Sequence, residues 1–218
     1  MKKIPALIIA SLTVFSLSAC GLIGQSANSV KSETEVSRPV VEDDRTLEEI
    51  AGPKTLKFFE EYSEEDGYTM TCTVNVSGSE LSLLSVIKGD KSYVNVDRED
   101  GAYAVLVNGE DVYMLMHSSK LAYKMDADSV KYGSYIQEAN SMLYGSTYSE
   151  GSITIDGVTY DTENYDGPAG TVRYCFLKDV FSYIVVDSEN EYVAIKITSL
   201  SNDVDESLFE VPEDYKIR

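Results

Sequence analysis

The chain has 218 residues, and 37 acidic side chains against 18 basic ones give it a net charge of −19 at pH 7. This balance excludes nucleic acid as a natural partner, because phosphate binding needs a basic surface stripe that is missing here. The charge also repels anionic lipid headgroups. The excess of acidic residues is therefore explained either by general solubility or by a cationic partner.

The first twenty residues are typical of a bacterial lipoprotein signal peptide. Lys2 and Lys3 precede an apolar segment, residues 4–17, which is shorter than the roughly 20 residues of a membrane-spanning helix. The next four, Leu-Ser-Ala-Cys at 17–20, resemble the lipobox of bacterial lipoprotein precursors. In that family the cysteine receives a diacylglycerol and becomes the new N-terminus, so the resemblance implies a lipid anchor at Cys20. The alternative is an ordinary signal peptide that an unrelated cysteine follows.

Lipid attachment at Cys20 predicts a protein that sits on the extracytoplasmic side of the bacterial cell membrane without spanning it, held by acyl chains such as palmitate. Removal of the signal peptide, residues 1–19, leaves 16 basic and 37 acidic side chains and a net charge of −21. Residues 20–45 show no helix or strand period and predict a flexible tether with a reach of about 25–30 Å. The remaining residues, 46–218, suit one domain.

The first regular elements expected after the tether are a helix and a run of strands. Thr46 and Glu49 have capping-box spacing, but Gly52 and Pro53 interrupt the pattern, so the firmer helix begins at Pro53. The hydrophobic period then changes to two. Gly-Asp and Asn-Gly pairs between the alternating runs predict tight hairpins and a six-stranded antiparallel meander. Its strands are expected at 68–76, 81–88, 91–97, 102–107, 111–117 and 120–126.

A second helix is predicted over residues 129–144, with its apolar stripe against the sheet. The stripe consists of Tyr132, Tyr135, Ile136, Ala139, Met142 and Leu143. Strands resume as a hairpin about Asp156-Gly157. With three more at 170–178, 181–187 and 191–199, the total is about eleven strands.

Cys72 and Cys175 are the thiols that remain once Cys20 is modified, and an extracytoplasmic location permits a disulfide between them. Strand alternation argues against it. Cys72 lies on the apolar face of its strand, whereas Cys175 alternates in phase with Thr171 and Arg173. The sequence leaves the disulfide open and favours two thiols on different surfaces.

This order of elements, a leading helix, a long meander, an inserted helix and returning strands, resembles the LolA/LolB-type lipoprotein-carrier fold. The closing stretch DESLFEVPEDYKI, residues 205–217, is similar to the ends of uncharacterised bacterial lipoproteins of this type. The resemblance implies a mainly β (α+β) domain, an antiparallel curved half-barrel with an N-terminal helix and a lid-like inserted helix. The family's interior arginine has no position that the sequence selects, since Arg98 falls in a turn and Arg173 on a strand.

The residue patterns favour neither catalysis nor a metal site. His117 is the only histidine, ends a strand without any nucleophile signature, and is expected to be structural. One histidine and two separated cysteines do not furnish zinc ligands, and the acidic runs at 97–100, 187–191 and 203–206 lack calcium-loop spacing. A carboxylate pair for glycoside hydrolysis is an alternative that spacing in the sequence does not test. We expect no enzyme, metal or cofactor.

Two functions remain open. In the first, the half-barrel binds an apolar ligand or lipidated client between the sheet and the inserted helix, in a cavity of roughly 300–1,000 Å³. In the second, a monomer with a filled core serves as an envelope interaction or sensor module; methionine suits both a lining and a filled core. The candidate ligand-binding residues are Met70, Met114, Met116, Tyr132, Tyr135, Ile136, Ala139 and Leu143.

Overall fold

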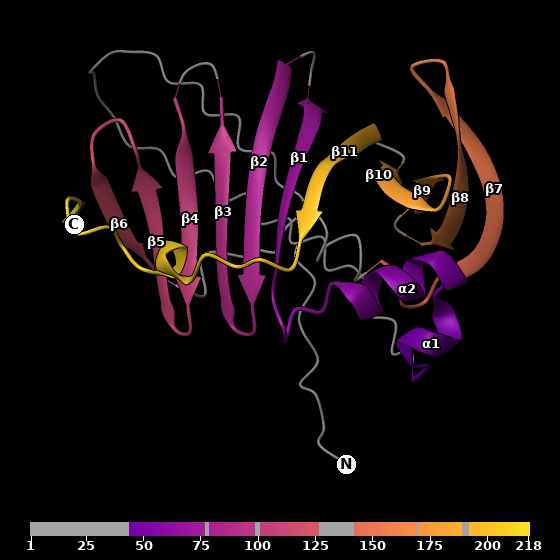
Figure 1. Cartoon of the computed structure of the whole chain (residues 1–218), viewed down its shortest axis with the longest axis horizontal. Coiled ribbons are helices and arrows are strands. Elements are labelled where there is room, and N and C mark those ends of the chain that lie inside the picture. Colours follow the sequence, from indigo (N-terminus) through magenta and orange to yellow (C-terminus); the bar gives the residue numbers. More distant parts are fainter. Residues whose placement is uncertain (1–43, 77–78, 99–100, 127–141, 169, 189–191) are drawn as a thin grey trace, which may run out of the picture. The chain divides into compact units, whose positions relative to one another are not determined.

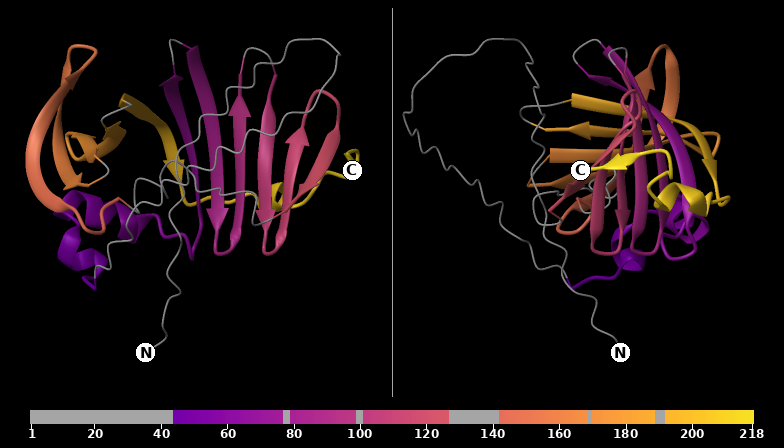
Figure 2. Two further views of the ribbon diagram at one scale, coloured as in Figure 1. Left: turned by 180° about the vertical axis from the view of Figure 1, so that it is seen from behind. Right: turned by 90° about the vertical axis from the view of Figure 1, so that its left-hand side faces the viewer.

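The computed structural model describes residues 44–76, 79–98, 101–126, 142–168, 170–188 and 192–218. The described residues belong to one compact unit, residues 43–218. In the described part of this unit, all strands join one twelve-stranded sheet that is curved and does not close (Figures 1 and 2). The mainly β half-barrel predicted from the sequence is confirmed.

The first half of the sheet is the predicted six-stranded meander. Its strands are β1 (Tyr68–Val76), β2 (Ser79–Lys88), β3 (Lys91–Asp97), β4 (Tyr103–Asn108), β5 (Asp111–Met116) and β6 (Leu121–Met125). Their ends differ from the predicted ends by at most two residues. Gly89 and Gly109 take positive φ angles of 60° and 62° in the hairpin turns, a conformation that glycine adopts without a steric penalty.

The second half is a five-stranded antiparallel meander. Its strands are β7 (Thr147–Ile155), β8 (Val158–Gly167), β9 (Gly170–Leu177), β10 (Val180–Asp187) and β11 (Tyr192–Ser201). β11 pairs with β1 and so joins the two meanders into one sheet. A short strand that the sequence did not predict, β12 (Lys216–Ile217), runs parallel to β6 and forms one edge, while β7 forms the other.

Two helices precede β1 and lie beside the β7–β10 part of the sheet, toward one end of its strands (Figure 1). α1 (Leu47–Ile50) starts where the capping box was predicted, with the Thr46 N–H donating to the Glu49 carboxylate at 2.8 Å. α2 (Pro53–Glu61) begins at the predicted proline. None of the helices in the described ranges is long and apolar enough to cross a membrane.

The predicted inserted helix, 129–144, falls mostly outside the described residues, which resume at Met142. Residues 142–145 form turns rather than a continuing helix, and Leu143 is fully buried in the main core.

The strand register divides the side chains of the sheet between two faces. The helix face carries the residues in register with Cys72, such as Leu83 and Ile197, and packs against α1 and α2. The tail face carries those in register with Val86, such as Tyr93. Its β2–β6 part packs against the C-terminal segment, residues 202–215, which includes the 3₁₀-helix η2 (Glu206–Phe209).

The two cysteines lie on opposite faces, as the strand alternation predicted. Cys72 belongs to the main core on the helix face, whereas Cys175 packs with Tyr160, Tyr183 and Val185 on the tail face. Both are buried and free, so no disulfide joins them. Burial raises the pKa of each thiol to about 12.

We expect Cys72 and Cys175 to resist iodoacetamide in the folded protein at about pH 8. The thiolate is the nucleophile, and a pKa of about 12 leaves on the order of one thiol in ten thousand ionised. Unfolding in urea restores the ordinary pKa and exposes both sulfurs, so both should then react. Mass spectrometry of proteolytic fragments separates these sites from Cys20, and rapid labelling of either thiol without urea would contradict the burial.

Candidate ligand-binding face

The β3–β6 hairpins place three cross-strand rows of side chains on the helix face. In the central row Val94 lies opposite Val105, which lies opposite Met114, which in turn lies opposite Tyr123. Side chains that oppose one another in this way have their Cβ atoms about 4.5–5.5 Å apart, so each row is continuous. Ser92 is the polar member of the three rows. The other eleven residues, which we call the apolar platform, are Val94, Val96, Tyr103, Val105, Val107, Val112, Met114, Met116, Leu121, Tyr123 and Met125.

Most of the platform lies outside the hydrophobic clusters of the described residues. Val105 and Val112 are 5% and 4% exposed, Tyr123 is 42% exposed, and the rest are half-buried. Of these eleven residues, Val96 packs against the main core, and the hydrophobic clusters of the described residues contain none of the others. Apart from Val105 and Val112, the platform side chains are therefore only partly covered.

Aromatic side chains fill the other half of the helix face, over β8–β10. The ring of Phe181 lies 4.5 Å from that of Phe58 on α2 and stacks on that of Tyr174 at 5.7 Å. Tyr174 in turn meets Tyr165 edge-on at 5.7 Å. Burial raises the pKa values of Tyr165 and Tyr174, so both hydroxyls stay neutral at physiological pH. The described side chains over β8–β10 are therefore packed against one another and against α2.

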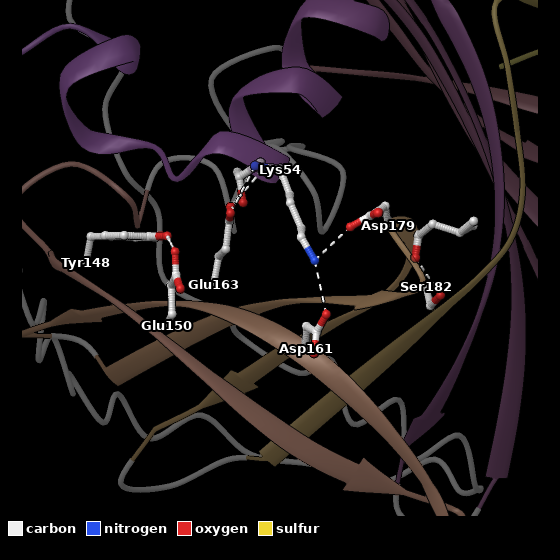
Figure 3. Close-up of polar contacts among 9 residues, drawn as sticks. Lys54, Tyr148, Glu150, Asp161, Glu163, Asp179 and Ser182 are labelled. Carbon is white, nitrogen blue, oxygen red and sulfur yellow. Dashed lines mark hydrogen bonds and ion pairs between the residues drawn. The ribbon is translucent and has the colours of Figure 1, made fainter.

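A buried carboxylate holds α2 in place over β8. Glu163, 3% exposed, accepts hydrogen bonds from the backbone N–H groups of Lys54 at 2.9 Å and Thr55 at 2.8 Å (Figure 3). These are donors of the first helical turn, which have no partner within a helix. Gly52 precedes the helix without a side-chain cap, and its own N–H donates to the Tyr165 hydroxyl at 2.8 Å. Glu163 thus does the work of an N-cap side chain.

Glycine at position 52 leaves room for this contact. A Cβ atom at position 52 would lie 2.5 Å from the Glu163 carboxyl carbon and would also overlap the ring of Tyr148. Beside it, the Lys54 ammonium pairs with Asp179 at 2.9 Å and Asp161 at 3.1 Å, and these two carboxylates raise its pKa. Both acids are largely exposed, so the ion pairs add little to stability compared with the buried contact.

The structure separates the sequence-predicted site residues into three groups. Met114 and Met116 lie on the platform, whereas Met70 and Leu143 are buried in the main core at 2% and 0% exposure. Tyr132, Tyr135, Ile136 and Ala139 lie outside the described residues.

His117 and Arg173, which were also considered in the sequence, lie on the tail face. His117 contacts the Tyr215 hydroxyl through Nδ1 at 2.6 Å and Asn95 Oδ1 through Nε2 at 2.8 Å, which ties β5 to the C-terminal segment. Arg173 pairs with Asp187 at 3.1 Å, away from the platform. Within the described ranges, no group of three His, Cys, Asp or Glu side chains is placed to hold a metal.

Sequence reasoning missed Glu163, Gly52 and the valines of the platform. A signal existed for the first two, since a helix that starts at Gly-Pro lacks a capping side chain and needs an acceptor from elsewhere in the chain. The platform valines are recognised from cross-strand register, that is, from which residues lie opposite one another on neighbouring strands. Alternation along a single strand does not contain this information.

No protein-family model and no curated protein matches the sequence. Solved structures are similar, among them an uncharacterised conserved protein from Thermus thermophilus, with a TM-score of 0.48 and 8% identity over 75% of this chain and 98% of that chain. LprF from Mycobacterium bovis has a TM-score of 0.42 and 12% identity over 76% and 99%. The Pseudomonas aeruginosa MucA/MucB complex gives 0.42 and 8% over 74% and 62%. Because similarity at this level carries no inference about function, we infer function from this chain's own residues.

Proposed function

We propose that this protein is a non-catalytic lipoprotein of the bacterial cell envelope that binds an apolar ligand or lipidated client on the apolar platform. A diacylglyceryl group on Cys20 anchors it to the extracytoplasmic side of the membrane, and its half-barrel is of the LolA/LolB type. The observation that carries the proposal is the division of the helix face: the β8–β10 part is packed with aromatic rings, while the β3–β6 part is apolar and, apart from Val105 and Val112, only partly buried.

The chemistry of the platform suits an acyl chain. Its rows carry valine, methionine, tyrosine and leucine side chains and no charged group, so a hydrocarbon meets no buried charge there. Each methylene moved from water onto such a surface contributes about 0.8 kcal/mol. Met114 and Met116 add unbranched, adaptable side chains that adjust to ligands of different shape.

A fluorescent fatty acid should bind saturably to the delipidated protein and be displaced by unlabelled fatty acid. Replacing Met114 and Met116 together by glutamine should weaken this binding at least about tenfold, because the amides lose water on contact with the chain. The matched control is Lys124→Gln, an exposed tail-face residue of β6, which should bind like the wild type. If no saturable binding is found, the protein is instead an interaction or sensor module that holds no ligand.

The anchor is tested separately by metabolic labelling with a palmitate analogue. The wild type and a Cys72→Ala variant should both be labelled, because Cys72 is a buried core thiol. Cys20→Ala should lose the label and leave the membrane fraction. Continued labelling of Cys20→Ala would show that the lipobox assignment is wrong.

A further inference from the structure

The two edges of the sheet differ in a way that the ligand-binding proposal does not explain. β12, at one edge, has two residues and is followed by Arg218. β7 lies at the other edge and pairs with β8 alone (Figures 1 and 2). It has nine residues, and those from 147 to 152 are all exposed. A long, exposed edge is a template on which another strand can pair.

The hairpin turn determines which backbone groups of β7 point outward. Asp156 and Gly157 have φ angles of 52° and 78°, as in the two-residue turns that close a hairpin on a hydrogen-bonded pair, here Ile155 and Val158. Hydrogen-bonded and non-hydrogen-bonded pairs alternate from that turn, and the register holds without a bulge. The outward N–H and C=O groups therefore belong to Tyr148, Glu150, Ser152 and Thr154.

The devices that commonly protect an exposed edge are missing from β7. Its sequence, TYSEGSITI, contains no proline, lysine or arginine, and Glu150 is its one charged residue. Proline, lysine and bulges are the usual means of preventing pairing with another chain. The edge is therefore chemically open to an added strand.

The two sides of β7 indicate what such a strand should carry. On the tail face, Ile153 and Ile155 pack against a small cluster that includes Tyr160, beside Val158, which is 40% exposed. On the helix face, Glu150 lies opposite Glu163, whose charge is taken up by the amides of α2. The contact recorded for Glu150 in the described structure is the Tyr148 hydroxyl at 2.9 Å rather than a cation (Figure 3).

We propose that the β7 edge binds an extended segment of another protein as an added antiparallel strand, with apolar side chains on its tail-face side and lysine or arginine on its helix-face side. A cation beside Glu150 would relieve the repulsion between the two opposed glutamates. A second copy of this chain fits less well. Each copy carries a net charge of −19, and self-pairing centred on Gly151 would place the two copies of Glu150 on the same face, diagonal to each other at about 7–8 Å.

The test uses the full chain in non-ionic detergent and a labelled peptide of alternating valine and lysine, matched in length to β7. Fluorescence anisotropy should show saturable binding that weakens as salt is raised. Ser152→Pro removes an outward N–H without touching the ladder to β8 and should weaken binding at least about tenfold. Ser152→Thr keeps that N–H and is the matched control. Glu150→Gln should bind more weakly and with less dependence on salt.

Hydrogen exchange in the unmodified protein provides a second readout that does not depend on how the proline variant folds. Peptide binding should slow exchange across residues 147–155. Unchanged exchange, or equal binding by the proline and threonine variants, would overturn the proposal. A dimer in sedimentation that Ser152→Pro dissociates and the peptide does not displace would also overturn it, because a second copy then holds the edge. Fatty-acid binding should be unaffected by Ser152→Pro, so this result and the platform proposal stand or fall separately.

Discussion

Replacing Phe209 by alanine is expected to lower the free energy of unfolding by about 3–5 kcal/mol, which is a large share of the stability of a typical domain. Phe209 is 2% exposed and packs on the tail face with Val86, Leu106 and Leu115. The cost has two parts: the lost transfer of the ring from water and the cavity left in a cluster that relaxes only partially.

The effect should extend beyond the ring because Phe209 anchors the C-terminal segment. The Asn108 side chain donates to the Phe209 carbonyl at 3.2 Å, and Asp205 caps η2 by accepting from the Ser207 N–H at 3.1 Å. Farther along, the same segment supplies β12 to the sheet edge. Loosening it should therefore also speed hydrogen exchange in residues 216–217.

Urea unfolding followed by circular dichroism measures the loss. Glu210→Ala is the matched control, since Glu210 is the exposed neighbour of Phe209 and should change stability by less than about 0.5 kcal/mol. If Phe209→Ala unfolds within that same range, the segment is an appendage and the tail-face core does not depend on it.

The part of the fold that the sequence predicted is the part determined locally. Period-two alternation and Asn-Gly or Gly-Asp turns lie within each hairpin, so all six strands of the first meander were predictable to within two residues. β12 has two residues, too few for any period, and pairs with β6 far away in the chain. The bulge where β11 passes Cys72 likewise depends on how two distant strands meet.

The candidate site shows the same division. Met114 and Met116 were predicted as candidate ligand-binding residues, and the register places both on the platform. Alternation did not reveal that Val94 and Val105 continue that surface on neighbouring strands, because only register shows which residues lie side by side. Lys54 and Glu163 are 109 positions apart, and only the curvature of the finished sheet brings them together.

Replacing Glu163 by glutamine is expected to lower the free energy of unfolding by about 1.5–3 kcal/mol, the range for buried hydrogen bonds to a charged group. Each carboxylate oxygen of Glu163 accepts one amide hydrogen, from Lys54 and from Thr55. A glutamine has one acceptor oxygen, and its NH₂ group would point its hydrogens at the second N–H. The substitution also removes the negative charge from the positive end of the helix.

Glu163→Ala should cost more, about 2–6 kcal/mol, because it leaves both amides without their acceptor at a cost of about 1–3 kcal/mol each when they stay buried. In both variants hydrogen exchange at the start of α2 should speed up more than exchange in β1–β6, since the lost contact is local to the helix and β8. This pattern distinguishes loss of the cap from a general loss of stability.

Glu150→Gln provides the matched control for the Glu163 substitutions. Glu150 is the direct cross-strand partner of Glu163, on the same face, but it is exposed and its recorded bond is to the Tyr148 hydroxyl, which a glutamine oxygen still accepts. It should therefore change stability by less than about 0.5 kcal/mol. Equal losses from Glu150→Gln and Glu163→Gln would mean that packing alone, through Phe58 and its neighbours, holds α2 on the sheet. A loss confined to Glu163 would assign that role to the buried carboxylate, beside which glycine at position 52 leaves the necessary room.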